Sequence, residues 1–352
     1  MTTCRPPWSE TPPAPAGVAE VLDILPPHLK EILFKLPRAL QESLEEIRLR
    51  SNRPLHVRWL GGEGWIDVRG KPTAVAGEAY QVKPQDLRHA VQALTDNSLY
   101  AWENELRSGY VTVKGGHRVG LVGEAVVEKG EVRTLKNIGA LNIRLARSVV
   151  GCSRPLLPYL IRENGRPYHI LLLSPPRCGK TTLLRDLVRS FSIGVPELGM
   201  RGLNVGVVDE RSEIAGCYQG IPQLDVGPRT DVLDRCPKVS GLLMLVRSMG
   251  PDVVATDEVG RPAELEALQE VLHSGVTLLA SVHASTLEEL KGRPGWTPLL
   301  EQGVWERLVV LGRSLGPGTV EAVLSGKDGR PVLVGPLRLT PASVNVGGKK
   351  VC

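Results

Sequence analysis

Residues Leu171–Leu184 read LLLSPPRCGKTTLL, and they indicate the architecture of the larger part of the chain. An apolar pattern typical of a buried strand, His169 to Leu173, leads into this run, and a helical pattern, Thr181 to Phe191, follows it. The run fits the phosphate-binding loop pattern G-x-x-x-x-G-K-[ST] at every fixed position except the first, where Ser174 replaces glycine. A loop at a helix start suits an anion, because backbone N–H groups and the helix dipole both attract it. The sequence therefore predicts a nucleotide site.

Individual roles follow from the position of each residue in this loop. Lys180 is expected to reach the β- and γ-phosphates of ATP, and Thr181 to place its hydroxyl on Mg²⁺. A serine at position 174 costs a little strain unless its backbone angles are ordinary, because only glycine tolerates positive φ freely. The residues predicted to bind the nucleotide are Ser174, Pro175, Pro176, Arg177, Cys178, Gly179, Lys180, Thr181 and Thr182.

Two adjacent carboxylates end an apolar run further along the chain. Residues Pro251–Glu258 read PDVVATDE, the pattern of a strand that ends at Asp257 and Glu258. In an open α/β sheet, ligands bind at the carboxyl ends of the strands. Asp257 is therefore expected in the Mg²⁺ shell, and Glu258 is expected to orient the attacking water. The alternative is a solvated acidic pair at a strand end.

A second acidic pair and a histidine occupy similar positions in the pattern. Asp209 and Glu210 end another apolar run, and Glu210 is expected to join the same Mg²⁺ and water network. The alternative is an ion-paired strand end beside Arg211. His283 closes a further strand pattern, where either His283 or Ser281 is expected to sense the γ-phosphate by hydrogen bonding. A structural histidine is the alternative there.

Arginines recur in structured contexts, at Arg229, Arg247, Arg261 and Arg313. In ring ATPases an arginine from a neighbouring subunit stabilises the charge that develops on the transferred phosphate. Arg261, just beyond Asp257 and Glu258, and Arg118, in the run GGHRVGL, are the candidates for this catalytic role. The alternative for each is an ordinary ion pair.

The bulk composition excludes several classes of protein. The net charge of +5 is too mild to indicate a nucleic-acid or membrane partner by itself. Six scattered cysteines without a C-x-x-C pair favour a reducing cytosol and argue against a structural zinc site. No apolar run approaches the roughly 18 residues needed to span a bilayer. The expected location is therefore cytoplasmic.

The chain divides by pattern into four segments. These are a disordered Pro-rich tail over 1–20, an α+β N-terminal domain over 21–147 that begins with a helical pattern from Leu29 to Glu45, a P-loop ATPase domain over 148–340, and a flexible tail over 341–352. Alternating strands and helices in the third segment predict an α/β fold with a mostly parallel sheet. Its expected strands are His169–Leu173, Asn204–Val208, Asp252–Thr256, Val276–Val282, Arg307–Leu311, Val320–Leu324 and Val332–Val334.

Runs in both large segments together resemble the stage III sporulation protein AA family, from about Leu22 to Val334. The resemblance is carried by LEEIRLR (44–50), GGHRVG (115–120), LNIR (141–144), VVDERSEIA (207–215), DVGPRTDVLD (225–234), RSM followed by PDVV (247–254) and GPGTVE (316–321). This combination is far more specific than the phosphate-binding loop alone.

That family is similar to the hexameric ATPases of type II and type IV secretion and pilus machines, which have a RecA/AAA-like P-loop domain. The resemblance implies a cytosolic ATPase, peripheral on the mother-cell side of a channel into the forespore. It implies a hexameric ring, membrane-embedded channel subunits as partners, and ATP and Mg²⁺ as cofactors. It also implies that Asp209–Glu210 and His283 flank the nucleotide, and that Arg118 or Arg144 approaches it from the N-terminal domain.

Two other functions are compatible with the same residues. A nucleotide-switched scaffold would bind ATP with little turnover, and Ser174 and the two loop prolines motivate this alternative. A nucleic-acid-associated P-loop ATPase would use the Arg-rich segment Arg48, Arg50, Arg53 and Arg58. That segment lacks the interleaved aromatic residues on which bases stack, so the nucleic-acid signal is weak.

Overall fold

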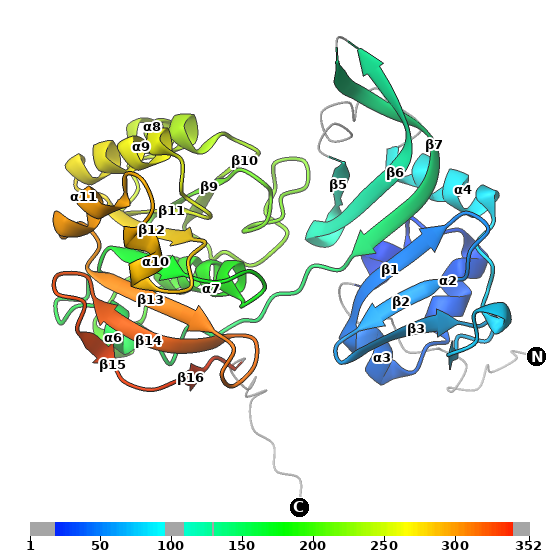
Figure 1. The fold of residues 1–352 in the computed structure, drawn as a ribbon, viewed down its shortest axis with the longest axis horizontal. Coiled ribbons are helices and arrows are strands. Elements are labelled where there is room, and N and C mark those ends of the chain that lie inside the picture. Colours follow the sequence, from blue (N-terminus) through cyan, green and yellow to red (C-terminus); the bar gives the residue numbers. More distant parts are fainter. Residues whose placement is uncertain (1–17, 96–108, 129, 341–352) are drawn as a thin grey trace, which may run out of the picture. The chain divides into compact units, whose positions relative to one another are not determined.

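The computed structural model describes residues 18–95, 109–128 and 130–340. The chain divides into two compact units, Met1–Arg147 and Ser148–Cys352, each with its own sheet (Figure 1). Helix α1 begins at Val18, inside the tail predicted over 1–20, whereas residues 1–17 and 341–352 lie outside the described part of the chain. The structure is therefore mixed α/β with two sheets.

The first unit is a seven-stranded antiparallel sheet with helices. The strand order is β4-β3-β2-β1-β7-β6-β5. The strands are β1 (Leu44–Arg50), β2 (His56–Trp59), β3 (Gly62–Ile66), β4 (Pro72–Thr73), β5 (Tyr110–Val113), β6 (His117–Glu128) and β7 (Glu131–Arg144), and the helices are α1 (Val18–Leu22), α2 (Pro27–Phe34), α3 (Arg38–Ser43) and α4 (Pro84–Thr95). The helical pattern from Leu29 to Glu45 is divided between α2 and α3 at Pro37, and its last two residues belong to β1.

The second unit is a nine-stranded mixed sheet. Its order is β10-β9-β11-β12-β8-β13-β14-β15, and β16 also pairs with β14. The strands are β8 (Ile170–Leu173), β9 (Val205–Asp209), β10 (Thr230–Asp234), β11 (Val253–Thr256), β12 (Thr277–Val282), β13 (Arg307–Gly312), β14 (Thr319–Ser325), β15 (Pro331–Leu333) and β16 (Leu337–Arg338). Pairing is parallel from β10 through β13 and antiparallel beyond it.

Helices cover this sheet on both faces (Figure 1). They are α6 (Leu157–Leu160), α7 (Lys180–Ile193), α8 (Lys238–Met249), α9 (Pro262–His273), α10 (Leu287–Lys291) and α11 (Trp296–Glu301). Leu172 of β8 packs into the cluster that contains Leu184 of α7, whereas Leu171 packs into the cluster that contains Leu242 of α8 and Leu268 of α9. All four residues of β8 are buried, as expected for a parallel strand between two helical layers.

The register aligns the carboxyl ends of the central strands. Leu173 pairs with Val282, and Thr256 pairs with both Val208 and Ala280. The residues that follow these strands are therefore delivered to one edge of the sheet, where loops rather than ladder hydrogen bonds determine the positions of side chains. Among the described residues, no helix is long and apolar enough to cross a membrane.

His117 is a buried titratable group in the first unit. Its side chain is almost completely enclosed, and its Nδ1 accepts a hydrogen bond from the Ala146 N–H at 2.9 Å. Because Nδ1 is an acceptor, the neutral ring carries its proton on Nε2, which is buried without a partner in the described residues. Burial lowers the pKa of His117, since a second proton would place charge in an apolar surrounding and oppose the Ala146 N–H.

Protonation of His117 should weaken the folded protein in mild acid. The folded-state pKa lies below the unfolded value of about 6.5, so the unfolded chain binds the proton first and stability falls as the pH drops below that value. Urea denaturation across this pH range should show the loss. His117→Gln keeps an acceptor and cannot titrate, so its profile should be flatter. If the free energy of unfolding changed equally with pH in both proteins, the loss of stability could not be assigned to His117.

Candidate nucleotide site

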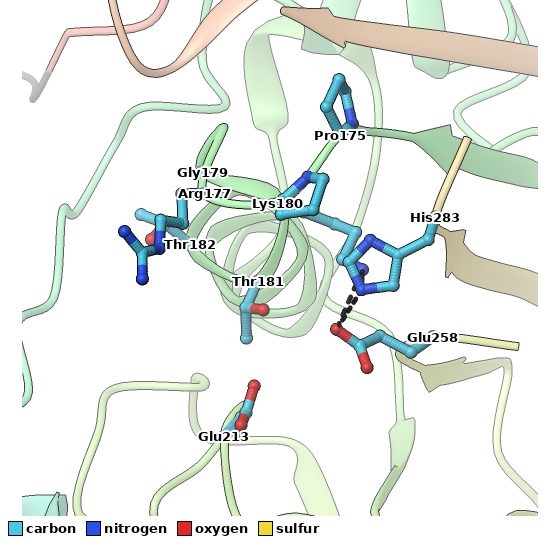
Figure 2. Close-up of a pocket in the computed structure, with 10 residues that line it drawn as sticks. Pro175, Arg177, Gly179, Lys180, Thr181, Thr182, Glu213, Glu258 and His283 are labelled. Atoms are coloured by element: carbon cyan, nitrogen blue, oxygen red, sulfur yellow. Dashed lines mark hydrogen bonds and ion pairs between the residues drawn. The ribbon is translucent and has the colours of Figure 1, made fainter. Parts of the chain in front are cut away.

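The phosphate-binding loop between β8 and α7 encloses one side of a cavity of about 430 Å³ (Figure 2). The cavity opens at the edge of the sheet where the central parallel strands end. Its lining residues are Pro175, Pro176, Arg177, Gly179, Lys180, Thr181, Thr182, Glu213, Glu258 and His283. The lining thus joins most of the predicted phosphate loop to two of the predicted catalytic residues, and it adds Glu213.

The backbone of the loop has ordinary angles at Ser174 and left-handed angles further on. Ser174 is fully buried, and its N–H donates to the Val282 carbonyl at 3.2 Å. Positive φ occurs at Arg177 (61°) and Gly179 (87°), and Ser174 is not among the described residues with positive φ. The serine in place of glycine therefore carries no left-handed strain, and it continues the pairing of β8 with β12.

Four side chains form an ion-paired network at the cavity. The Lys180 amine lies 3.1 Å from Glu258 Oε1, and His283 Nε2 lies 2.8 Å from the same oxygen (Figure 2). Arg211 approaches the other carboxylate oxygen, with Nη1 3.0 Å from Oε2. The distance between Lys180 Nζ and His283 Nε2 is 3.3 Å. One carboxylate is therefore the shared acceptor of a lysine, an arginine and a histidine.

Burial and charge oppose each other within this network. Burial lowers the pKa of Lys180, and the Glu258 carboxylate partly offsets that effect. Burial raises the pKa of Glu258, but the neighbouring Lys180, His283 and Arg211 outweigh it, so the pKa lies below its usual value. Glu258 is consequently ionised at neutral pH, and it is the counter-ion of a lysine that is only 6% exposed.

The backbone at Glu258 is held in an uncommon conformation. Its φ is 48°, a left-handed value that costs a non-glycine residue roughly 1–3 kcal/mol. The Glu258 N–H donates to Ser281 Oγ at 3.0 Å, which ties this turn to the neighbouring strand β12. Ser281 therefore orients the backbone of Glu258, while His283, two residues further along, contacts its carboxylate.

The acidic segment after β9 is organised by a buried aspartate. Asp209 is fully buried, and its two oxygens accept hydrogen bonds from the N–H groups of Glu213, Ile214 and Ala215 at 2.7 to 2.9 Å. Burial raises the pKa of Asp209, which the three amide donors oppose. The Arg185 guanidinium fixes the same loop from the other side by donating to the Glu213 and Ile214 carbonyls. The loop is thereby folded back so that Glu213 lines the cavity.

The two glutamates of this segment therefore differ in their surroundings. Glu210 forms an ion pair with the buried Lys238 and is not among the residues that line the cavity. Glu213, three residues further on, is a lining residue that sequence reasoning did not select. The catalytic role of Glu210 stays a prediction, and Glu213 is the carboxylate of this segment that has access to the cavity.

Asp257, directly after β11, is a buried acidic residue with one unpaired oxygen in the described part of the chain. It is 1% exposed, and its Oδ2 is buried without a hydrogen-bond partner among the described residues. Burial, followed by the charge of Asp209, raises its pKa to about 7. A buried carboxylate oxygen without a partner suits a hard cation such as Mg²⁺, which takes few protein ligands besides phosphate and water. No described cluster of three or more His, Cys, Asp or Glu side chains could hold a metal alone.

The predicted arginines have separate environments. Arg118 belongs to the first unit, where its guanidinium lies 4.5 Å from the centre of the Tyr110 ring. Arg261 is exposed at the start of α9, where its N–H donates to Glu264 at 3.0 Å, and it does not line the cavity. Arg229 donates to the Ser192 carbonyl, and Arg247 pairs with Glu270 on the outside of α9.

Comparisons with known proteins identify relatives over most of the chain. A family model described as "Sporulation stage III, protein AA" matches residues 18–330. Stage III sporulation protein AA of Bacillus subtilis is 42% identical over 310 residues, which cover 88% of this chain and 95% of that protein. The protein SEEDLING PLASTID DEVELOPMENT 1 of Arabidopsis thaliana is 27% identical over 286 residues, which cover 81% of this chain and 36% of that protein.

A solved structure shares the fold. The pilus retraction motor PilT, solved with bound ADP, superposes with a TM-score of 0.50 and 13% sequence identity. The match covers 77% of this chain and 75% of that chain. At this identity the likeness concerns the arrangement of the elements alone.

The unpartnered Asp257 should destabilise the ligand-free protein at neutral and alkaline pH. Its folded-state pKa of about 7 lies above the unfolded value near 4, so ionisation opposes folding and stability is lost as the pH rises between these values. Asp257→Asn cannot ionise. It should therefore have a higher free energy of unfolding than the wild type at about pH 8, and little advantage near pH 4. Urea denaturation at both pH values tests this, and a constant difference between the two proteins would contradict it.

Proposed function

The chain belongs to the sporulation stage III, protein AA family, and from this premise we propose that it is an ATPase that works as a ring of identical copies. The reaction is ATP + H₂O to ADP and phosphate. It would energise or gate a secretion-like channel between mother cell and forespore during endospore formation. The observation that carries the proposal is the convergence of Lys180, His283 and Arg211 on Glu258 at the N-terminus of α7.

The nucleotide would enter through an exchange of partners at Lys180. The lysine is buried, so it needs an anion beside it, and in the structure this anion is Glu258. A phosphate bound at the N–H groups of the loop supplies a stronger anion at the same place. Lys180 then contacts phosphate, and one oxygen of Glu258 becomes available to accept a hydrogen bond from the attacking water.

The other lining residues have distinct tasks in this proposal. Thr181 and Asp257 would hold Mg²⁺, which neutralises phosphate charge when it is bound. His283 would donate to the γ-phosphate once Glu258 has turned toward water. Glu213, on the opposite acidic loop, would fix the water that Glu258 activates. Each task uses a side chain that lines the cavity or, for Asp257, a buried oxygen that has no hydrogen-bond partner in the part of the chain that the structure describes.

Assembly would complete the site. We propose that the α+β domain (21–147) and the ATPase domain (148–340) of neighbouring copies pack in a hexameric ring, so that Arg118 or Arg144 reaches a nucleotide. In the isolated first unit Arg144 shares the Glu46 carboxylate with Arg48, at 3.5 Å and 3.0 Å. The ring would be cytoplasmic and peripheral, with membrane-embedded channel subunits as partners.

Turnover should depend on Lys180 and Glu258 in different ways. Lys180→Ala should abolish ATP binding, because the phosphate loses its buried cation. Glu258→Gln should bind ATP at least as tightly as the wild type but hydrolyse it about 10²-fold more slowly, because it cannot accept a proton from water. Phosphate release and equilibrium binding measure the two effects. Equal turnover in all three proteins would refute the enzyme, whereas tight binding without turnover in the wild type would support a nucleotide-switched scaffold.

The two glutamates after β9 should differ in their effect on turnover. Glu213→Gln should lower kcat about 10²-fold if Glu213 fixes the water, because it lines the cavity. Glu210→Gln should leave kcat within a few-fold and should lower stability, because it leaves the buried Lys238 with weaker neutralisation. Steady-state kinetics and urea denaturation of both variants test this. A larger loss of kcat in Glu210→Gln than in Glu213→Gln would support the predicted catalytic role of Glu210 and contradict this assignment.

A further inference from the structure

The phosphate loop contains a left-handed turn at a non-glycine residue, and few of its own groups can stabilise that turn. Gly179 is the only glycine between Ser174 and Lys180. Pro175 and Pro176 have no N–H, and Arg177 has a φ of 61° that a non-glycine residue adopts only at a cost. A loop of this composition needs contacts from outside to hold the left-handed turn in place.

Such contacts come from the turn between β13 and β14, residues 313–318. Arg313 Nη2 donates to the Pro176 carbonyl at 3.2 Å and to the Arg177 carbonyl at 3.0 Å. The Gly318 N–H donates to the next carbonyl, that of Cys178, at 3.2 Å. Three consecutive carbonyls of the phosphate loop are therefore bound by one turn that lies more than 130 residues away in the sequence.

These three hydrogen bonds also determine the direction of the N–H groups in the same peptide units. In a trans peptide the C=O and the following N–H point in opposite directions, and the described chain contains no cis peptide. Fixing the carbonyls of Pro176, Arg177 and Cys178 toward the turn therefore directs the N–H groups of Arg177, Cys178 and Gly179 away from it. The turn contributes no residue to the cavity lining, so it acts on the cavity only through the loop.

The turn is itself rigidly held. The Glu321 carboxylate accepts hydrogen bonds from the Ser314 N–H at 3.0 Å and from the Ser314 hydroxyl at 2.7 Å. The Thr319 hydroxyl donates to the Gly316 carbonyl at 2.6 Å, and the Gly318 carbonyl accepts from the Leu339 N–H at 2.9 Å. A fixed turn can impose its geometry on the loop, which a mobile one could not.

Close approach at Gly179 completes the contact. A Cβ on Gly179 would lie 3.5 Å from Gly318 Cα, so the two backbones meet without an intervening side chain. Gly179 and Gly318 both have positive φ, 87° and 80°. The two glycines let the loop and the turn pack backbone against backbone, which brings Arg313 within reach of the carbonyls.

We propose that the turn 313–318 positions the phosphate loop, with Arg313 as the positioning residue, and so stabilises the left-handed backbone at Arg177 that a non-glycine residue adopts only at a cost. This inference rests on the proposed nucleotide function. Arg313 does not touch the nucleotide in this arrangement. It aims the N–H groups that do, and its loss should therefore weaken nucleotide binding more than it slows the chemical step.

The test compares Arg313→Ala and Arg313→Lys with the wild type in the full chain. Arg330→Ala is the matched control, because Arg330 is an exposed arginine with one acidic partner, on the neighbouring hairpin. The measurements are calorimetric titration with Mg²⁺ and ADP, and kcat and KM for ATP. Arg313→Ala should weaken ADP binding and raise KM about tenfold, since two charge-assisted hydrogen bonds are lost, while kcat stays within about threefold. Arg313→Lys, which keeps one donor group, should lie between Arg313→Ala and the wild type.

Two further readouts distinguish positioning from a general loss of structure. Amide hydrogen exchange at residues 177–180 should accelerate in nucleotide-free Arg313→Ala but not in Arg330→Ala, while exchange in β8 stays unchanged. Millimolar guanidinium should restore part of the ADP affinity of Arg313→Ala alone. Unchanged affinity and unchanged exchange in Arg313→Ala would overturn the inference, and so would a proportional fall of kcat and thermal stability without a change in KM. Failure of the proposed function itself would appear in the wild type, as absent ADP binding or absent turnover.

Discussion

The register of the parallel strands is the constraint on which the site depends. Because Leu173 pairs with Val282 and Thr256 pairs with Val208 and Ala280, the strands β8, β9, β11 and β12 end at one edge of the sheet, within about two residues of one another. A shift by one residue would exchange the two faces of a strand that is buried on both sides. The two apolar layers around β8 therefore fix the relative positions of the residues that follow it and its neighbours.

Much of this architecture is readable from the sequence, because buried strands leave continuous apolar runs. The strand β10 is not readable in this way, since Thr230–Asp234 contains two aspartates and lies at the edge of the sheet, where burial is incomplete. The helical pattern from Leu29 to Glu45 failed for a local reason, because α2 ends at Phe34 and Pro37 is the N-cap from which α3 begins. Hydrophobic periodicity indicates which segments are buried. It does not indicate where one helix ends and the next begins, or where a partly exposed strand pairs with the edge of a sheet.

The same distinction applies to the site. Lys180, Glu258 and His283 follow directly from strands or begin a helix, so sequence position alone brings them to the edge of the sheet. Glu213 reaches the cavity only because Asp209 gathers three N–H groups and turns the loop back. A buried aspartate must find donors, so its position at a strand end was an available signal. The contact of Arg313 with the loop had no local signal, because it joins residues 136 and 137 positions apart.

The left-handed backbone at Glu258 accompanies its ion pair with Lys180. A lysine that is 6% exposed cannot remain charged without an anion, and Glu258 supplies it from a left-handed backbone position fixed by Ser281. The same carboxylate cannot both neutralise Lys180 and accept a proton from water. In the proposed mechanism a bound phosphate would remove the first task, while Arg211 would still hold the second oxygen of Glu258. In the proposed mechanism, occupation of the site by an anion is therefore the event that converts Glu258 from a counter-ion into a base.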